Sequence, residues 1–78
     1  MPPEYPPSAR ESGVEGVVLV QALVGKDGRV KDVRVQRPSP MFNDAAVACV
    51  YQWRFKPALA KGDPVAVWVA IPVKFSLH

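Results

Sequence analysis

The segment Gly16–Val24 most constrains what this chain can fold into, because it is apolar on both sides of a strand. Side chains alternate between the two faces of a strand, and both sets here are mainly aliphatic. One set comprises Val18, Val20, Ala22 and Val24, and the other comprises Val17, Leu19 and Leu23. A strand of this kind is usually central in its sheet. We therefore expect a neighbouring strand on each side of it.

A tight turn and a return strand are predicted directly after this segment. The sequence Gly25-Lys26-Asp27-Gly28 ends in an Asp-Gly pair, which tolerates the positive φ that tight hairpin turns require. Apolar and polar residues then alternate over Val30–Arg37 until Pro38. The polar positions favour an edge strand, paired antiparallel with Gly16–Val24.

An amphipathic helix is predicted after the hairpin. Its apolar stripe has the spacing of one helix face and comprises Phe42, Ala46, Cys49, Val50 and Trp53. The run Trp53-Arg54-Phe55-Lys56-Pro57 follows this stripe. Proline lacks an N–H and restricts the residue before it. We expect the helix to continue through Trp53 and Phe55 and to stop at Pro57.

A short helix is also predicted between Tyr5 and Gly13, because prolines open this segment and a glycine closes it. Tyr5 and Ala9 should pack inward from it. The four prolines among the first seven residues resemble the end of a stiff polyproline spacer. We therefore expect residues 1–4 to end a spacer and residues 5–78 to form the domain.

The last segment, Val65–Leu77, alternates with a period of two residues, which predicts a strand. Residues 58–64 are expected to form a loop before it, with a polar turn at Lys61-Gly62-Asp63.

Pro72 indicates which side of this last strand is free. The main-chain groups of successive residues point alternately to the two lateral sides of a strand. Proline is tolerated where its side faces an open edge, so Trp68 and Ala70 are expected to face that edge as well. An exposed edge can accept another strand. The alternative is that Pro72 and Lys74 only guard the edge against aggregation.

Composition limits the function classes. A chain of 78 residues forms one small domain with a thin core. The net charge is +3, with a modest basic patch at Arg29, Lys31, Arg34 and Arg37. Nucleic-acid interfaces carry denser cationic clusters and aromatic residues placed to stack on bases. Nucleic acid is therefore not expected as a partner.

Chemistry-bearing residues are few. Cys49 is the single cysteine and His78, the last residue, is the single histidine. A multi-cysteine metal site is excluded, and a thiol enzyme built on Cys49 would depend on a terminal histidine. That reading requires a reactive, low-pKa thiol. We expect no catalytic residues, metal or cofactor, and interpret Cys49 as a small buried side chain.

The order of these elements resembles the C-terminal domain of TonB-family energy transducers. The resemblance covers Tyr5 to Leu77. It is carried by Tyr5-Pro6 with Ala9 and Arg10, Gly16 before the alternating valines, Asp27-Gly28-Arg29-Val30, and Trp53-Arg54-Phe55-Lys56-Pro57. It implies an α+β fold with a three-stranded antiparallel sheet in the order 2-1-3 and two helices on one face.

The resemblance also implies a function. The family domain lies in the periplasm, tethered by a proline-rich spacer to an inner-membrane helix that works with ExbB and ExbD. It captures the TonB box of an outer-membrane transporter as an added strand, for uptake of nutrients such as siderophores, haem or cobalamin. Carried onto this chain, the docking edge comprises Val65, Ala66, Val67, Trp68, Val69, Ala70 and Ile71.

A second hypothesis is a TolA-like or self-associating adaptor domain of the same fold. The outer face of the sheet holds more apolar surface than a solvated face needs. The residues expected to form this partner or homodimer surface are Val17, Leu19, Leu23 and Tyr5, together with Trp68.

Overall fold

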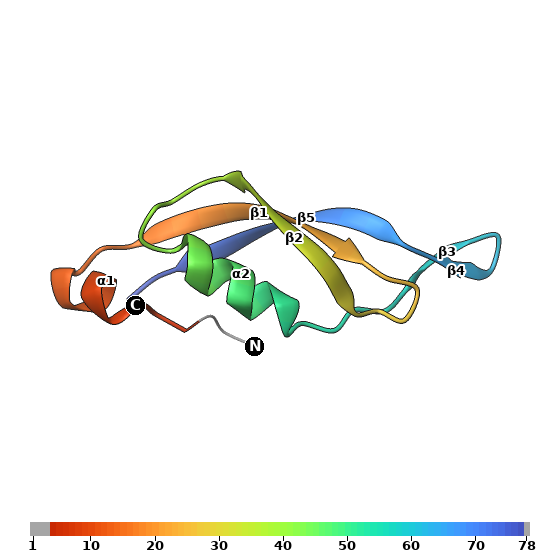
Figure 1. Cartoon of the computed structure of the whole chain (residues 1–78), viewed down its shortest axis with the longest axis horizontal. Helices are drawn as coiled ribbons and strands as arrows, with labels where there is room; N and C mark the ends of the chain where they lie inside the picture. Colours follow the sequence, from red (N-terminus) through yellow and green to blue (C-terminus); the bar gives the residue numbers. More distant parts are fainter. Residues whose placement is uncertain (1–3, 78) are drawn as a thin grey trace.

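Three long strands form an antiparallel sheet in the computed structural model, which describes residues 4–77. Strand β1 (Gly16–Val24) is central, between β2 (Val30–Arg37) and β5 (Val67–Phe75) (Figure 1). The expected order, with the doubly apolar segment in the middle, is confirmed. The molecule is elongated, measuring 49 × 20 × 18 Å.

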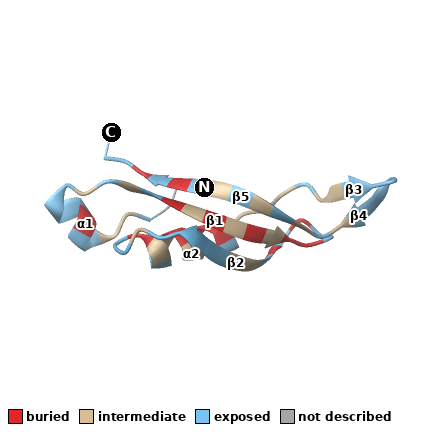
Figure 2. Ribbon diagram, turned by 90° about the horizontal axis from the view of Figure 1, so that it is seen from above, coloured by how far each residue is buried: buried red, intermediate tan, exposed pale blue. Residues whose placement is uncertain are grey.

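The core lies on one face of this sheet. Alternate residues of β1 are buried there, from Val18 to Val24, and helix α2 (Asn43–Tyr51) packs against β1 and β2 (Figure 2). The buried residues of α2 are Ala46, Cys49 and Val50, as its apolar stripe predicts. No helix of the described chain covers the opposite face of the sheet.

Helix α1 (Pro7–Ser12) closes one end of the core, and Gly13 ends it in the left-handed conformation at φ 68°. Ala9 is fully buried. The Tyr5 ring meets Phe42 and Phe75 edge-on, at 5.6 and 5.9 Å between centroids, while those two rings stack at 4.5 Å. The Tyr5 hydroxyl donates a hydrogen bond to the carbonyl of Val14. The expected inward packing of Tyr5 and Ala9 is confirmed.

The end of the second helix differs from the prediction. Helix α2 ends at Tyr51, and Trp53–Pro57 lies outside it. The Phe55 N–H donates to the carbonyl of Gly28 at 2.9 Å, and Arg54 forms an isolated bridge with Arg29. This pairing with the β1–β2 turn competes with a further helical turn and draws the segment into an extended form.

Within residues 4–77, no helix is long and apolar enough to cross a membrane.

The expected loop at residues 58–64 is instead a small hairpin. Strand β3 (Ala58–Ala60) pairs with β4 (Asp63–Val65), and the hairpin projects beyond the end of the sheet (Figure 1). Lys61 and Gly62 both have positive φ, at 52° and 84°, as a two-residue hairpin turn of the primed type requires. The prediction was wrong because each strand is only three residues long, too short to show alternation.

Candidate functional site

The free edge of β5 is the clearest candidate site. Within residues 4–77, β5 pairs with β1 alone, because the sheet order is β2-β1-β5. The register places Leu19 opposite Pro72, Gln21 opposite Ala70, and Leu23 opposite Trp68. One lateral side of β5 therefore has no neighbouring strand in the described sheet.

Pro72 determines which main-chain groups of β5 face this edge. Opposed residues in an antiparallel pair alternate between those that exchange hydrogen bonds and those that do not. Since Pro72 has no N–H to exchange with Leu19, this pair belongs to the second kind. Trp68 and Ala70 lie four and two residues before Pro72, at the same alternate positions of β5. Their N–H and C=O groups therefore also point away from β1. Pro72 itself offers only its carbonyl, which interrupts the row of outward donors.

The predicted docking residues fall into three groups. Trp68 and Ala70 have exposed side chains on the outer face of the sheet and outward main-chain groups. Val67, Val69 and Ile71 are half-buried, point to the core face and pair towards β1. Val65 and Ala66 precede β5, and Val65 is paired with Ala58 in the hairpin. The free edge therefore belongs to β5, which begins at Val67, and its outward main-chain groups are those of Trp68 and Ala70.

The outer face of the sheet holds most of the second predicted surface. Val17 is 50% exposed and Trp68 is 44% exposed, while Leu19 and Leu23 are half-buried. The Arg34 guanidinium lies over the Trp68 ring, 5.2 Å from its centroid. Tyr5 does not join this surface, because its ring packs against Phe42 and Phe75 in the core.

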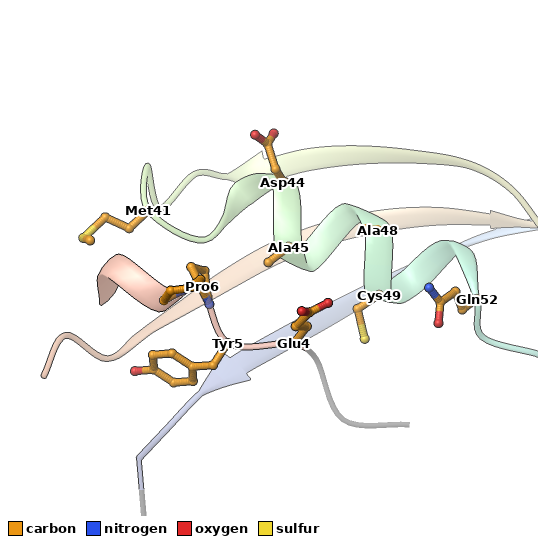
Figure 3. A pocket seen from close by; sticks show the side chains of 10 residues that line it. Glu4, Tyr5, Pro6, Met41, Asp44, Ala45, Ala48, Cys49 and Gln52 are labelled. Atoms are coloured by element: carbon orange, nitrogen blue, oxygen red, sulfur yellow. The ribbon is translucent and has the colours of Figure 1, made fainter. Parts of the chain in front are cut away.

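A groove of about 540 Å³ separates the N-terminal segment from α2 (Figure 3). It is lined by Glu4, Tyr5, Pro6, Pro7, Met41, Asp44, Ala45, Ala48, Cys49 and Gln52. Sequence reasoning missed this groove, because it arises from a contact between segments far apart in the chain.

The structure offers little support for chemistry at Cys49. The side chain is 6% exposed and lies on the core side of α2. His78, its expected partner in a thiol enzyme, lies outside the described residues. Among residues 4–77, no three His, Cys, Asp or Glu side chains gather closely enough to hold a metal ion.

Known proteins show what this chain is similar to. Residues 1–77 match the model of the family described as Gram-negative bacterial TonB protein C-terminal. The chain is 34% identical over 79 residues to Protein TonB of Xanthomonas campestris pv. campestris, an alignment that covers 99% of the chain and 35% of that protein. It is 36% identical over 78 residues to Protein tonB2 of Pseudomonas aeruginosa, covering 97% of the chain and 29% of that protein.

A solved structure agrees with these sequence similarities. The solution NMR structure of the Pseudomonas aeruginosa TonB CTD superimposes with a TM-score of 0.81 at 34% identity, covering 100% of this chain and 81% of that one. The chain spans about a third of the length of the TonB proteins it matches.

Proposed function

Because this chain belongs to the family of Gram-negative TonB C-terminal domains, we propose that it is a docking domain. It captures the TonB box of an outer-membrane transporter as an added strand on the free edge of β5. Proteins of this family are transducers and not enzymes, so the domain acts by binding. The observation that carries the proposal is that the main-chain groups of Trp68 and Ala70 point to the side of β5 that has no neighbouring strand in the described sheet.

Strand addition explains how a flat edge can be selective. Main-chain hydrogen bonds supply affinity, and the side chains beside them supply specificity. Each bond contributes only about 0.5 to 1.5 kcal/mol net, and the flexible peptide must be ordered. Binding in the micromolar range, near 8 kcal/mol, is the expected result. Such a complex forms and dissociates readily, which suits a partner that must be released.

The direction of pulling makes a weak complex useful. A force along the strand loads all of the hydrogen bonds between β5 and the peptide together. A force across the strands would break them one after another. The domain would therefore transmit force to the transporter in spite of its modest equilibrium affinity.

The rest of the protein supplies the energy in this proposal. A proline-rich spacer, which ends near residue 4, tethers the domain in the periplasm to an inner-membrane helix. That helix works with ExbB and ExbD, which couple the proton motive force to transporters for nutrients such as siderophores.

An NMR titration tests the proposal. Adding a short TonB-box peptide to the labelled domain should shift the backbone amides of Trp68 and Ala70 most, together with those of their neighbours on β5. The amides of Gly13 and Gly62, which lie away from this edge, are internal controls. The absence of any shift at millimolar peptide would exclude capture at this edge.

Exposed apolar surface favours a second candidate, a self-associating or TolA-like adaptor. Val17 and Trp68 are each about half exposed on the open face of the sheet, and burying them in a second copy would be favourable. If this face mediates association, Trp68→Ser should convert an oligomer to a monomer in light scattering. Leu59→Ser is the matched control, because Leu59 is 66% exposed on the separate β3–β4 hairpin. A monomer in both the wild type and Trp68→Ser excludes self-association through this face.

A further inference from the structure

Positive charge gathers at one end of the molecule. The β1–β2 turn, the segment after α2 and the β3–β4 hairpin meet at this end (Figure 1). Together they carry Lys26, Arg29, Arg54, Lys56 and Lys61 against Asp27 and Asp63, and the start of β2 adds Lys31 and Asp32. The opposite end, around α1, carries Glu4, Glu11 and Glu15 together with Arg10 and Lys74. The excess of positive charge therefore lies at the first end.

Two of these cations are direct register partners. Arg29 and Arg54 form an isolated antiparallel bridge, and both residues are exposed. Directly opposed residues have Cβ atoms about 5 Å apart on the same face, and like charges in this arrangement are destabilising. The fold therefore places two exposed arginines directly opposite each other.

The nearby carboxylates are already engaged. Asp27 accepts hydrogen bonds from the Arg29 main-chain N–H and from the Lys31 ammonium, both at 3.0 Å. The pKa of the Asp27 carboxyl is lowered, first by the Arg29 N–H and then by Lys31. Asp32 pairs with Arg34 at 3.4 Å. In the described part of the chain, no carboxylate forms an ion pair with the side chains of Arg29, Arg54 or Lys56.

The backbone beneath these cations is held in place. The Phe55 N–H donates a 2.9 Å hydrogen bond to the carbonyl of Gly28. The Phe55 side chain packs against the core, whereas the side chains of Arg54 and Lys56 on either side of it are exposed. Arg54 and Lys56 therefore lie on the same side of an extended segment. Arg29 lies across from Arg54, and Lys56 lies two residues further along the same segment, so the three cations form a corner-shaped cluster.

We propose that Arg29, Arg54 and Lys56 form an anion-binding site for an extended acidic segment of a partner polypeptide. Guanidinium groups bind carboxylates through paired, planar hydrogen bonds. Alternate side chains of an extended peptide lie about 6.8 Å apart on one face, which is also the spacing of Arg54 and Lys56. A peptide with acidic residues at every second position would place one carboxylate between Arg29 and Arg54 and the next beside Lys56. This site is independent of peptide capture at β5.

A phosphate group fits this cluster of Arg29, Arg54 and Lys56 less well. One phosphate can be held between Arg29 and Arg54, but it leaves Lys56 without a partner. An anionic membrane would be expected to meet more apolar surface at this end, where the β3–β4 hairpin presents one large exposed side chain, Leu59. The spacing of the three cations favours the peptide.

The test is an NMR titration with the acetylated, amidated peptide Glu-Thr-Glu-Thr-Glu, using Gln-Thr-Gln-Thr-Gln as the uncharged control. The amides of residues 28–30 and 54–56 should shift with the acidic peptide alone, and the affinity should fall as salt rises. Inorganic phosphate and phosphatidylglycerol vesicles are tested in parallel. Equal shifts with phosphate, or binding to vesicles alone, would overturn the assignment to a peptide.

Matched variants separate this site from general charge attraction. Arg54→Gln should weaken binding of the acidic peptide about fivefold, whereas Arg37→Gln, the same change on exposed β2, should alter it less than twofold. Equal losses in the two variants would show that only net charge matters.

Thermal unfolding is the second readout, because Arg54→Gln relieves repulsion from Arg29 and should not lower Tm. A lower Tm with unchanged peptide binding would assign Arg54 a structural role instead.

Discussion

Replacing Gly28 by alanine is expected to lower the free energy of unfolding by about 3 kcal/mol. Gly28 has φ +80°, and a Cβ atom there would stand 2.0 Å from the carbonyl oxygen of Phe55. The left-handed conformation costs a non-glycine residue about 1 to 2 kcal/mol. The clash would also separate Phe55 from Gly28 and break the hydrogen bond between them, which contributes about 1 kcal/mol. A domain of this size is stable by about 4 to 12 kcal/mol, so much of that margin would be lost.

Gly62→Ala is the matched control for this prediction. Gly62 has φ +84°, close to that of Gly28, but nothing lies within 4 Å of the point that a Cβ atom would occupy there. It should therefore show only the conformational cost, about 1 to 2 kcal/mol. Urea unfolding of both variants measures the difference. Equal losses would mean that the contact between the turn and Phe55 contributes nothing to stability.

Replacing Ala70 by proline is expected to weaken binding of a TonB-box peptide about tenfold or more while leaving the domain folded. The change removes the N–H of Ala70, an outward donor on β5, and each such bond contributes about 1 kcal/mol. The proline ring also obstructs the approach of a strand to this edge. The ladder to β1 should survive, because Ala70 has the same parity as Pro72, which β5 already accommodates.

Ala70→Val is the control for this second prediction, since it retains the N–H and suits a strand. Calorimetric titration gives the peptide affinity, and the amide spectrum shows whether the sheet is intact. Unchanged affinity in Ala70→Pro would place the peptide elsewhere on the domain. An altered spectrum throughout β1 would instead show that the main chain of Ala70 pairs towards β1.

Local patterns in the sequence determined the three long strands. Gly16–Val24 is apolar on both faces, and this property alone predicts a central strand, because neighbouring strands on both sides shield its apolar side chains from water. The Asp27-Gly28 turn likewise predicts the neighbour of this strand. Pro72 marked the free edge for an equally local reason, since a missing N–H is tolerated only where no neighbour needs it.

Contacts between distant segments decided what the sequence could not. The apolar stripe of α2 includes Trp53, yet the helix ends at Tyr51, because the next residues pair with the β1–β2 turn. The β3–β4 hairpin includes Val65, so the last long strand begins at Val67 and not at Val65. Periodicity reports which face of an element is buried, but not which remote main-chain group will compete for the hydrogen bonds at its end. For the same reason, the cluster of Arg29, Arg54 and Lys56 exists only in the folded chain.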